Sequence, residues 1–119
     1  MVGPSIVLRV GGDCTSVTRV RAIVQRLLDS TPRRYLLGLG SIVVICVEEL
    51  PKRERRRLAE DRRGNILGRY HPATKGQVAW IELFADRMLY TPGTAWRRLP
   101  LLRDLFVGRV LFHEIGHHV

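Results

Sequence analysis

The sequence predicts an α+β fold, with a small, twisted, mixed sheet of about four strands, one helix packed behind it and one helix at the C-terminus. Three observations carry this prediction. Four short apolar segments have strand character, two longer segments repeat apolar residues every three or four positions, and Pro and Gly lie between the last two strand segments. The length, 119 residues, is that of one domain. We therefore expect a single domain over residues 1–119.

The first half of the chain predicts a strand, a helix and a second strand. Residues 6–10 are apolar apart from Arg9 and are followed by two glycines, as in a strand that leads into a turn. Residues 17–28 then carry apolar side chains on one helical face, and Pro32 ends that helix. Residues 42–47 are a continuous apolar, largely β-branched run, typical of a central strand covered on both faces. This order predicts a right-handed crossover that joins two parallel strands.

The next segment is polar and precedes a predicted hairpin. Residues 51–65 are rich in basic side chains, which predicts a loop or an exposed helix outside the core. Two strands are expected at residues 66–70 and 77–84, because the connection between them contains Pro72 and Gly76. In the second strand every other side chain from position 79 on is apolar, and we expect that side to face the core. A loop with Pro and Gly at positions 92 and 93 follows.

The last segment, residues 101–119, predicts a helix that begins near Pro100. Its predicted core-facing stripe, with spacings of three to four residues, consists of Leu101, Leu105, Gly108, Phe112, Ile115 and Val119. A neighbouring stripe consists of Phe106, Val110, His113 and His117. The two glycines lower the helix propensity by about 1 kcal/mol each. We expect them to allow close packing or to leave room beside a ligand.

The end of this helix carries an H-E-x-x-H motif, formed by His113, Glu114 and His117. The two histidines are four residues apart, about 40° around the helix axis, so both imidazoles can reach one tetrahedral Zn²⁺. Glu114 lies about 100° away, which suits contact with a water molecule better than with the metal. The alternative is structural: two histidines that interact with the carbonyl end of the helix dipole.

Residues 111–118 resemble the active-site helix of zincin metallopeptidases, especially small ones with Gly before the second histidine. The order of strand, helix, strand, hairpin and helix resembles the zincin core as well. The resemblance implies a zincin-like fold and a peptide or protein substrate. It also implies Zn²⁺ bound by His113 and His117, with Glu114 as the general base. In that family the strand before the active-site helix is the sheet edge that binds substrate. The resemblance assigns this role to Ala79, Trp80, Ile81 and Glu82.

The third zinc ligand is not evident in the sequence. Zincins usually take it from a position after the active-site helix, and here the sequence ends at Val119. We therefore expect a fragment that lacks this ligand and that retains zinc weakly or not at all; whether it is active alone stays open. His118 points about 100° away from His117 and is expected beside the site rather than on the metal. His71, Glu82 and Asp86 are further candidates, although nothing in their spacing favours them.

The charge pattern supports a second hypothesis. The net charge is +9, 18 of the 20 basic residues are arginine, and the densest basic stretch lies between Arg53 and Arg63. Such a stretch favours nucleic acid or an acidic partner, so a regulatory binding module with an inactive zincin-like domain stays open. An exposed, solvated basic segment is the simpler interpretation, because no aromatic residues are interleaved with it. The chain has no apparent signal peptide or membrane span, and we expect Cys14 and Cys46 to be reduced in a cytoplasmic protein.

Overall fold

A computed structural model of the chain describes residues 4–8, 14–60, 66–90 and 95–119. It contains a four-stranded sheet in the order β1-β2-β4-β3, whose strands are β1 (Ser5–Leu8), β2 (Leu39–Ile45), β3 (Gly68–His71) and β4 (Ala79–Phe84). Strands β1, β2 and β4 are parallel, and β3 pairs antiparallel with β4. The predicted mixed sheet, the parallel pairing and the hairpin are therefore confirmed.

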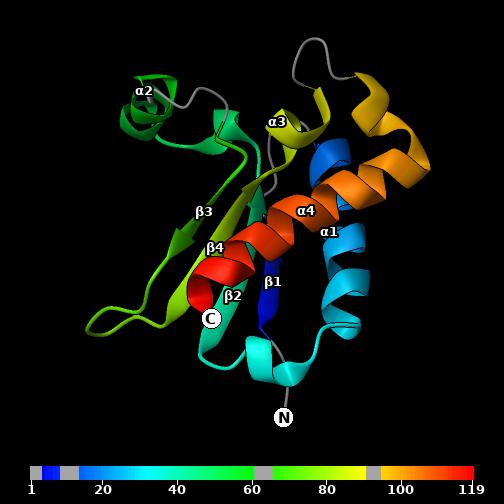
Figure 1. The fold of residues 1–119 in the computed structure, drawn as a ribbon. Helices are drawn as coiled ribbons and strands as arrows, with labels where there is room; N and C mark the ends of the chain where they lie inside the picture. The colour runs from blue at the N-terminus through cyan, green and yellow to red at the C-terminus, as the bar shows by residue number, and fades with distance from the viewer. Residues whose placement is uncertain (1–3, 9–13, 61–65, 91–94) are drawn as a thin grey trace.

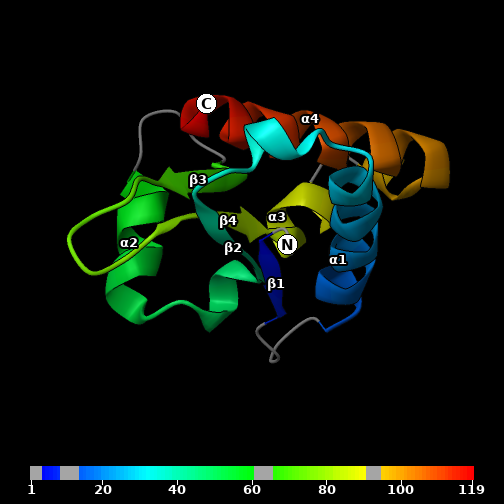
Figure 2. The same ribbon diagram turned by 90° about the horizontal axis from the view of Figure 1, so that it is seen from below.

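Four α-helices surround the sheet (Figures 1 and 2): α1 (Cys14–Asp29), α2 (Lys52–Glu60), α3 (Ala85–Tyr90) and α4 (Pro100–His118). Figure 2 shows α1 and α4 on one side of the sheet and α2 on the other. No helix in these parts of the chain is both long and apolar enough to span a bilayer. The expected loop at positions 92 and 93 lies outside the described residues.

The larger core lies between the sheet and helices α1, α3 and α4. Its fully buried members include Val20, Val24, Val44, Ile81, Leu83, Met88, Val107 and Leu111. Each such side chain contributes about 1.5–3 kcal/mol relative to exposure to water. Ala79, Ile81 and Leu83 of β4 all belong to this core, so the predicted core face of that strand is confirmed. Cys46 is also buried there.

The opposite face of the sheet is also covered. Val43, Ile45 and Phe84 pack there with Leu50 and Leu58 in a second apolar cluster. Of the two alternatives for the basic segment, the helix is present as α2, but Leu58 is only 2% exposed. The expectation that this segment contributes nothing to the core is therefore wrong. Because β2 is apolar on both faces, its second face needs a cover, and a single leucine of α2 helps to provide it.

The predicted core-facing stripe of α4 is largely wrong. Leu101, Leu105 and Val119 are exposed by 73%, 64% and 74%, whereas the buried side carries Val107, Gly108, Val110, Leu111, Glu114 and Ile115. The helix is apolar around most of its circumference, so more than one of its faces has apolar residues at spacings of three to four. The spacing alone therefore does not identify the face that packs on the core. The amino-terminal part of α4 also projects beyond α1 and the sheet, where there is no core to cover it (Figures 1 and 2).

Candidate active site

The two histidines of the motif meet at their outer nitrogens. His113 Nε2 and His117 Nε2 are 3.3 Å apart, with ring planes at 87° to each other. Two imidazole nitrogens at 2.0–2.1 Å from one tetrahedral Zn²⁺ would be separated by about 3.3–3.4 Å. Their separation therefore suits a shared zinc ion, and it also permits a direct N–H···N contact. Both side chains are exposed to solvent.

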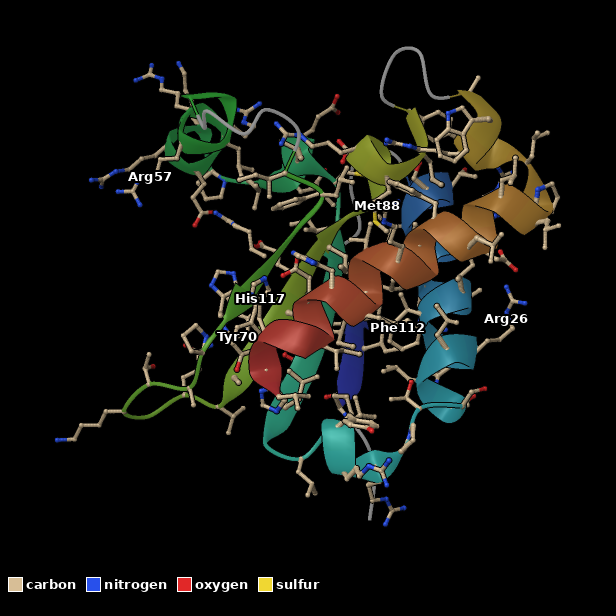
Figure 3. All side chains as sticks on the ribbon, viewed as in Figure 1. Arg26, Arg57, Tyr70, Met88, Phe112 and His117 are labelled. Carbon is tan, nitrogen blue, oxygen red and sulfur yellow. The ribbon has the colours of Figure 1, made fainter. Side chains whose placement is uncertain are left out.

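A cleft of about 900 Å³ lies in front of this pair, between α4, β3 and α2. Helix α4 contributes Phe106, Arg109, Val110, His113, Glu114 and His117. The segment from Ile66 to His71 lines it, and Arg57 and Leu58 of α2 complete it. In Figure 3, His117 and Tyr70 lie close to each other where α4 crosses β3, and Arg57 lies on α2 above them. All three residues of the motif therefore border one open site.

Glu114 lies on the buried side of α4 yet still borders the cleft. The residue is only 7% exposed, and its stem packs against Gly68 of β3. A Cβ atom at Gly68 would lie 3.4 Å from Glu114 Cγ and 3.0 Å from the carbonyl oxygen of Glu82. The glycine therefore lets the strand approach the carboxylate. Gly68 was not predicted as a site residue. A glycine inside a predicted strand nevertheless indicates a position where another part of the protein or a ligand can approach the backbone closely.

His118 has different partners. Its Nε2 lies 2.6 Å from the carbonyl oxygen of Leu37, and its Nδ1 lies 2.8 Å from the hydroxyl of Tyr70. A carbonyl only accepts, so Nε2 carries a proton, and Nδ1 shares the second hydrogen bond with the Tyr70 hydroxyl. Both ring nitrogens are thus engaged away from the His113–His117 pair. Tyr70 connects this anchor to the site because it also lines the cleft.

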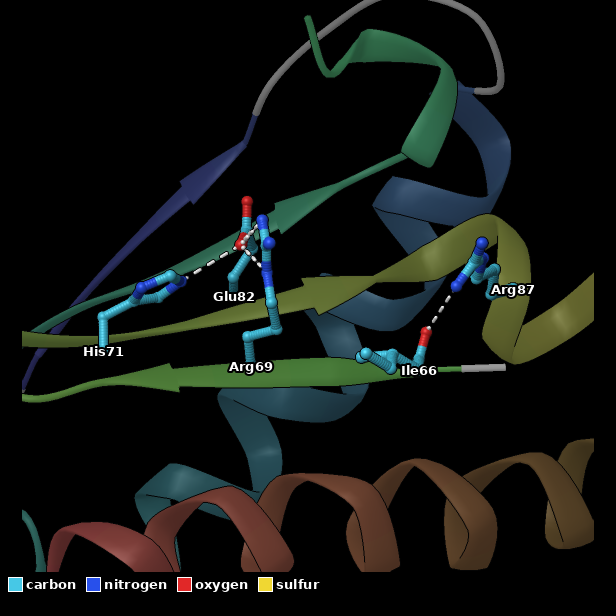
Figure 4. Close-up of polar contacts among 5 residues, drawn as sticks. All are labelled: Ile66, Arg69, His71, Glu82 and Arg87. Carbon is cyan, nitrogen blue, oxygen red and sulfur yellow. Dashed lines mark hydrogen bonds and ion pairs between the residues drawn. The ribbon is translucent and has the colours of Figure 1, made fainter. Parts of the chain in front are cut away.

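The other candidate ligands are held by other partners, although His71 also lines the cleft; Figure 4 shows His71 and Glu82. His71 Nε2 contacts Glu82 Oε1 at 3.1 Å, and Arg69 reaches the same oxygen at 2.7 Å on the face of the sheet away from α4. The His71 ring stacks on Trp80 with centroids 3.9 Å apart. Asp86 accepts the backbone N–H of Val47 at 3.0 Å, which ties α3 to the end of β2. Among the described residues, no three His, Cys, Asp or Glu side chains gather to hold a metal.

The expected substrate edge is in the wrong strand. Ala79, Trp80, Ile81 and Glu82 lie in β4, which pairs with β2 on one side and β3 on the other, so its backbone groups are occupied. The predicted hairpin already places β3 on one side of β4, and the parallel strand β2 occupies the other side, which the expected edge role would need open. Strand β3 is the edge of the sheet beside α4.

The outer edge of β3 presents backbone groups for which the described residues provide no backbone partner. Leu67 O accepts a hydrogen bond from Phe84 N at 3.0 Å. Residues that bond to the partner alternate along an antiparallel pair, so the backbone N–H and C=O of Gly68 and Tyr70 point away from β4. These two residues can pair with an added strand.

No protein-family model matches the chain, and neither curated proteins nor solved structures gave a match.

Proposed function

We propose that the protein is a zinc-dependent metallopeptidase of the zincin type. One observation carries the proposal: the Nε2 atoms of His113 and His117 are 3.3 Å apart at the rim of a cleft that Glu114 also borders. This separation fits two ligands of one tetrahedral zinc ion. We also place the protein in the cytoplasm, where thiols such as that of the buried Cys46 stay reduced.

The chemistry follows from the side chains of the motif. Zinc, when bound, would lower the pKa of a water molecule and polarise the carbonyl of the scissile bond. The Glu114 carboxylate would take the proton from the attacking water and pass it to the leaving amine. Glu114 is fixed for this role by its packing against Gly68. A substrate that pairs with the outward groups of Gly68 and Tyr70 would pass beside this carboxylate.

The third ligand stays unassigned. Two histidines alone hold zinc less tightly than the three protein ligands of a typical catalytic site. We expect weak zinc binding unless a group outside the described residues joins them.

The test is the Glu114→Gln variant, compared with wild type at saturating zinc. We expect hydrolysis of a quenched peptide library to fall by about 10²–10⁴-fold, because the general base is lost. Zinc binding, measured by equilibrium dialysis with elemental analysis, should not change. The matched control is Glu48→Gln, which changes an exposed carboxylate outside the cleft. Full activity in Glu114→Gln would contradict the assignment of the base, and an inactive wild type at saturating zinc would contradict the function.

A nucleic-acid-binding module is the second candidate. Helix α2 exposes Lys52, Arg53, Arg55, Arg56 and Arg57, a dense row of positive charge. Binding through these residues should weaken steeply with salt, since each phosphate contact releases a counterion. Two results would exclude this candidate: an oligonucleotide that does not bind at low salt, or one whose affinity does not change with salt concentration.

A further inference from the structure

We propose that the cleft selects peptides with acidic side chains, and that Arg57 and Arg109 determine this specificity. The inference rests on the proposed peptidase function, and it names the class of substrate. Arg57 projects from α2 and Arg109 from α4, and both are exposed residues that line the cleft. Neither forms an ion pair with a carboxylate of the described residues. Among the described residues, no carboxylate therefore competes with a ligand for these two charges.

The other charges of the cleft do not cancel these two. Arg69 also lines the cleft, but Glu82 already neutralises it at 2.7 Å. Glu114 is the one carboxylate among the described lining residues, and it is only 7% exposed. A zinc ion at the histidine pair would add further positive charge. The cleft surface is thus cationic, and a carboxylate on a bound peptide would meet attraction from α2 and from α4.

The positions of the two arginines relative to β3 favour a peptide over a nucleic acid. Arg109 precedes His113 by one helical turn, a rise of about 6 Å, so it lies beside the proposed reaction centre. Arg57 lies on α2 and lines the same cleft. The outward backbone groups of Gly68 and Tyr70, which also line this cleft, offer hydrogen bonds that a peptide backbone can complete. A nucleic acid has no backbone amide to pair with this edge.

The experiment measures binding separately from hydrolysis. A fluorescein-labelled decapeptide with four Asp or Glu residues is compared with the same peptide carrying Asn and Gln at those positions. Fluorescence anisotropy is recorded with the zinc-loaded Glu114→Gln variant and again with the zinc-free protein. We expect the acidic peptide to bind about tenfold more tightly at low salt, since each exposed ion pair adds about two- to fivefold. The difference should largely vanish at 0.5 M NaCl because the charges are screened.

Three charge-neutralising variants locate the effect. Arg57→Gln and Arg109→Gln should each reduce affinity for the acidic peptide about two- to fivefold and leave the amide peptide unchanged. Arg21→Gln removes the same charge from an exposed position on α1 outside the cleft and should change neither affinity. Circular dichroism checks that all three variants fold.

Several results would overturn the inference. Equal affinity for both peptides would refute it, and so would an equal loss in Arg21→Gln, which would indicate diffuse attraction. An oligonucleotide that binds more tightly than the acidic peptide through the same two arginines would assign the patch to nucleic acid. If hydrolysis is absent while this peptide discrimination holds, the proposed function fails and the binding specificity stands.

Discussion

The last two turns of α4 have two sides with opposite environments. On the open side, His113 and His117 are exposed and contact each other, and an added Cβ at Gly116 would meet no atom within 4 Å. On the packed side, Ile115 is buried and His118 is bonded at both nitrogens to Leu37 and Tyr70. Neighbouring histidines of the same helix therefore differ in whether their nitrogen lone pairs are available. One residue, about 100° of helical rotation, separates a candidate ligand from an anchor.

The largest expected difference between the two sides is in zinc affinity. His117→Ala removes one of two proposed ligands and should weaken zinc binding by more than about 100-fold, because even supporting residues around a metal cost 10–100-fold. His118→Ala should change zinc affinity less than about tenfold. Competition with a colorimetric chelator measures both values. If His118→Ala loses zinc as severely as His117→Ala, the distinction between ligand and anchor fails.

Folding stability should show the reverse order. His118→Ala removes the hydrogen bonds to the Leu37 carbonyl and the Tyr70 hydroxyl, which should lower the free energy of unfolding by about 0.5–1.5 kcal/mol. His113→Ala removes an exposed side chain and should change it by less than about 0.5 kcal/mol. Urea unfolding of the metal-free protein gives both numbers. A larger loss in His113→Ala would show that the open side contributes to the fold.

The sequence predicted the sheet and the motif because both depend on local patterns. The run at residues 42–47 and the alternation in β4 each depend on one short segment; the alternation lies within β4, and β2 begins three residues before the predicted run and ends two residues before its end. The predicted buried face of α4 was wrong because the face that packs on the core depends on where the sheet ends. A local sequence pattern contains no information on that position. The edge strand was wrong for a similar reason. In the described sheet β3 pairs only with β4, whereas β4 pairs with both β2 and β3. This order is a property of the whole sheet and not of one segment.

The site divides in the same way. Four-residue spacing on a helix predicts that His113 and His117 meet, and the structure adds the distance between their nitrogens. The contributions of Gly68 and Tyr70 come from β3, more than 40 residues earlier in the chain, and only the folded sheet brings them beside α4. The third ligand is a question of the same kind, since spacing along the helix does not determine it.

The smallest expected effects come from two glycine substitutions that compare the open side of α4 with the packed strand below it. Gly116→Ala places a methyl group in open space and should raise the free energy of unfolding by about 0.5–1 kcal/mol through better helix propensity. Gly68→Ala places its methyl group 3.0 Å from the carbonyl oxygen of Glu82 and 3.1 Å from Leu83 Cδ2, so it should destabilise by about 1 kcal/mol.

Thermal unfolding and hydrolysis are both measured on these two variants, so that an effect on stability can be told from an effect on activity. Gly68→Ala should reduce hydrolysis as well as stability, because the new methyl group also crowds Glu114 Cγ at 3.4 Å. Gly116→Ala should be stable, so a loss of hydrolysis in that variant would indicate that the open space beside His117 accommodates the substrate. If instead Gly68→Ala retains both full stability and full activity, β3 has room to yield, and the close approach of the strand to Glu114 is not what fixes the carboxylate.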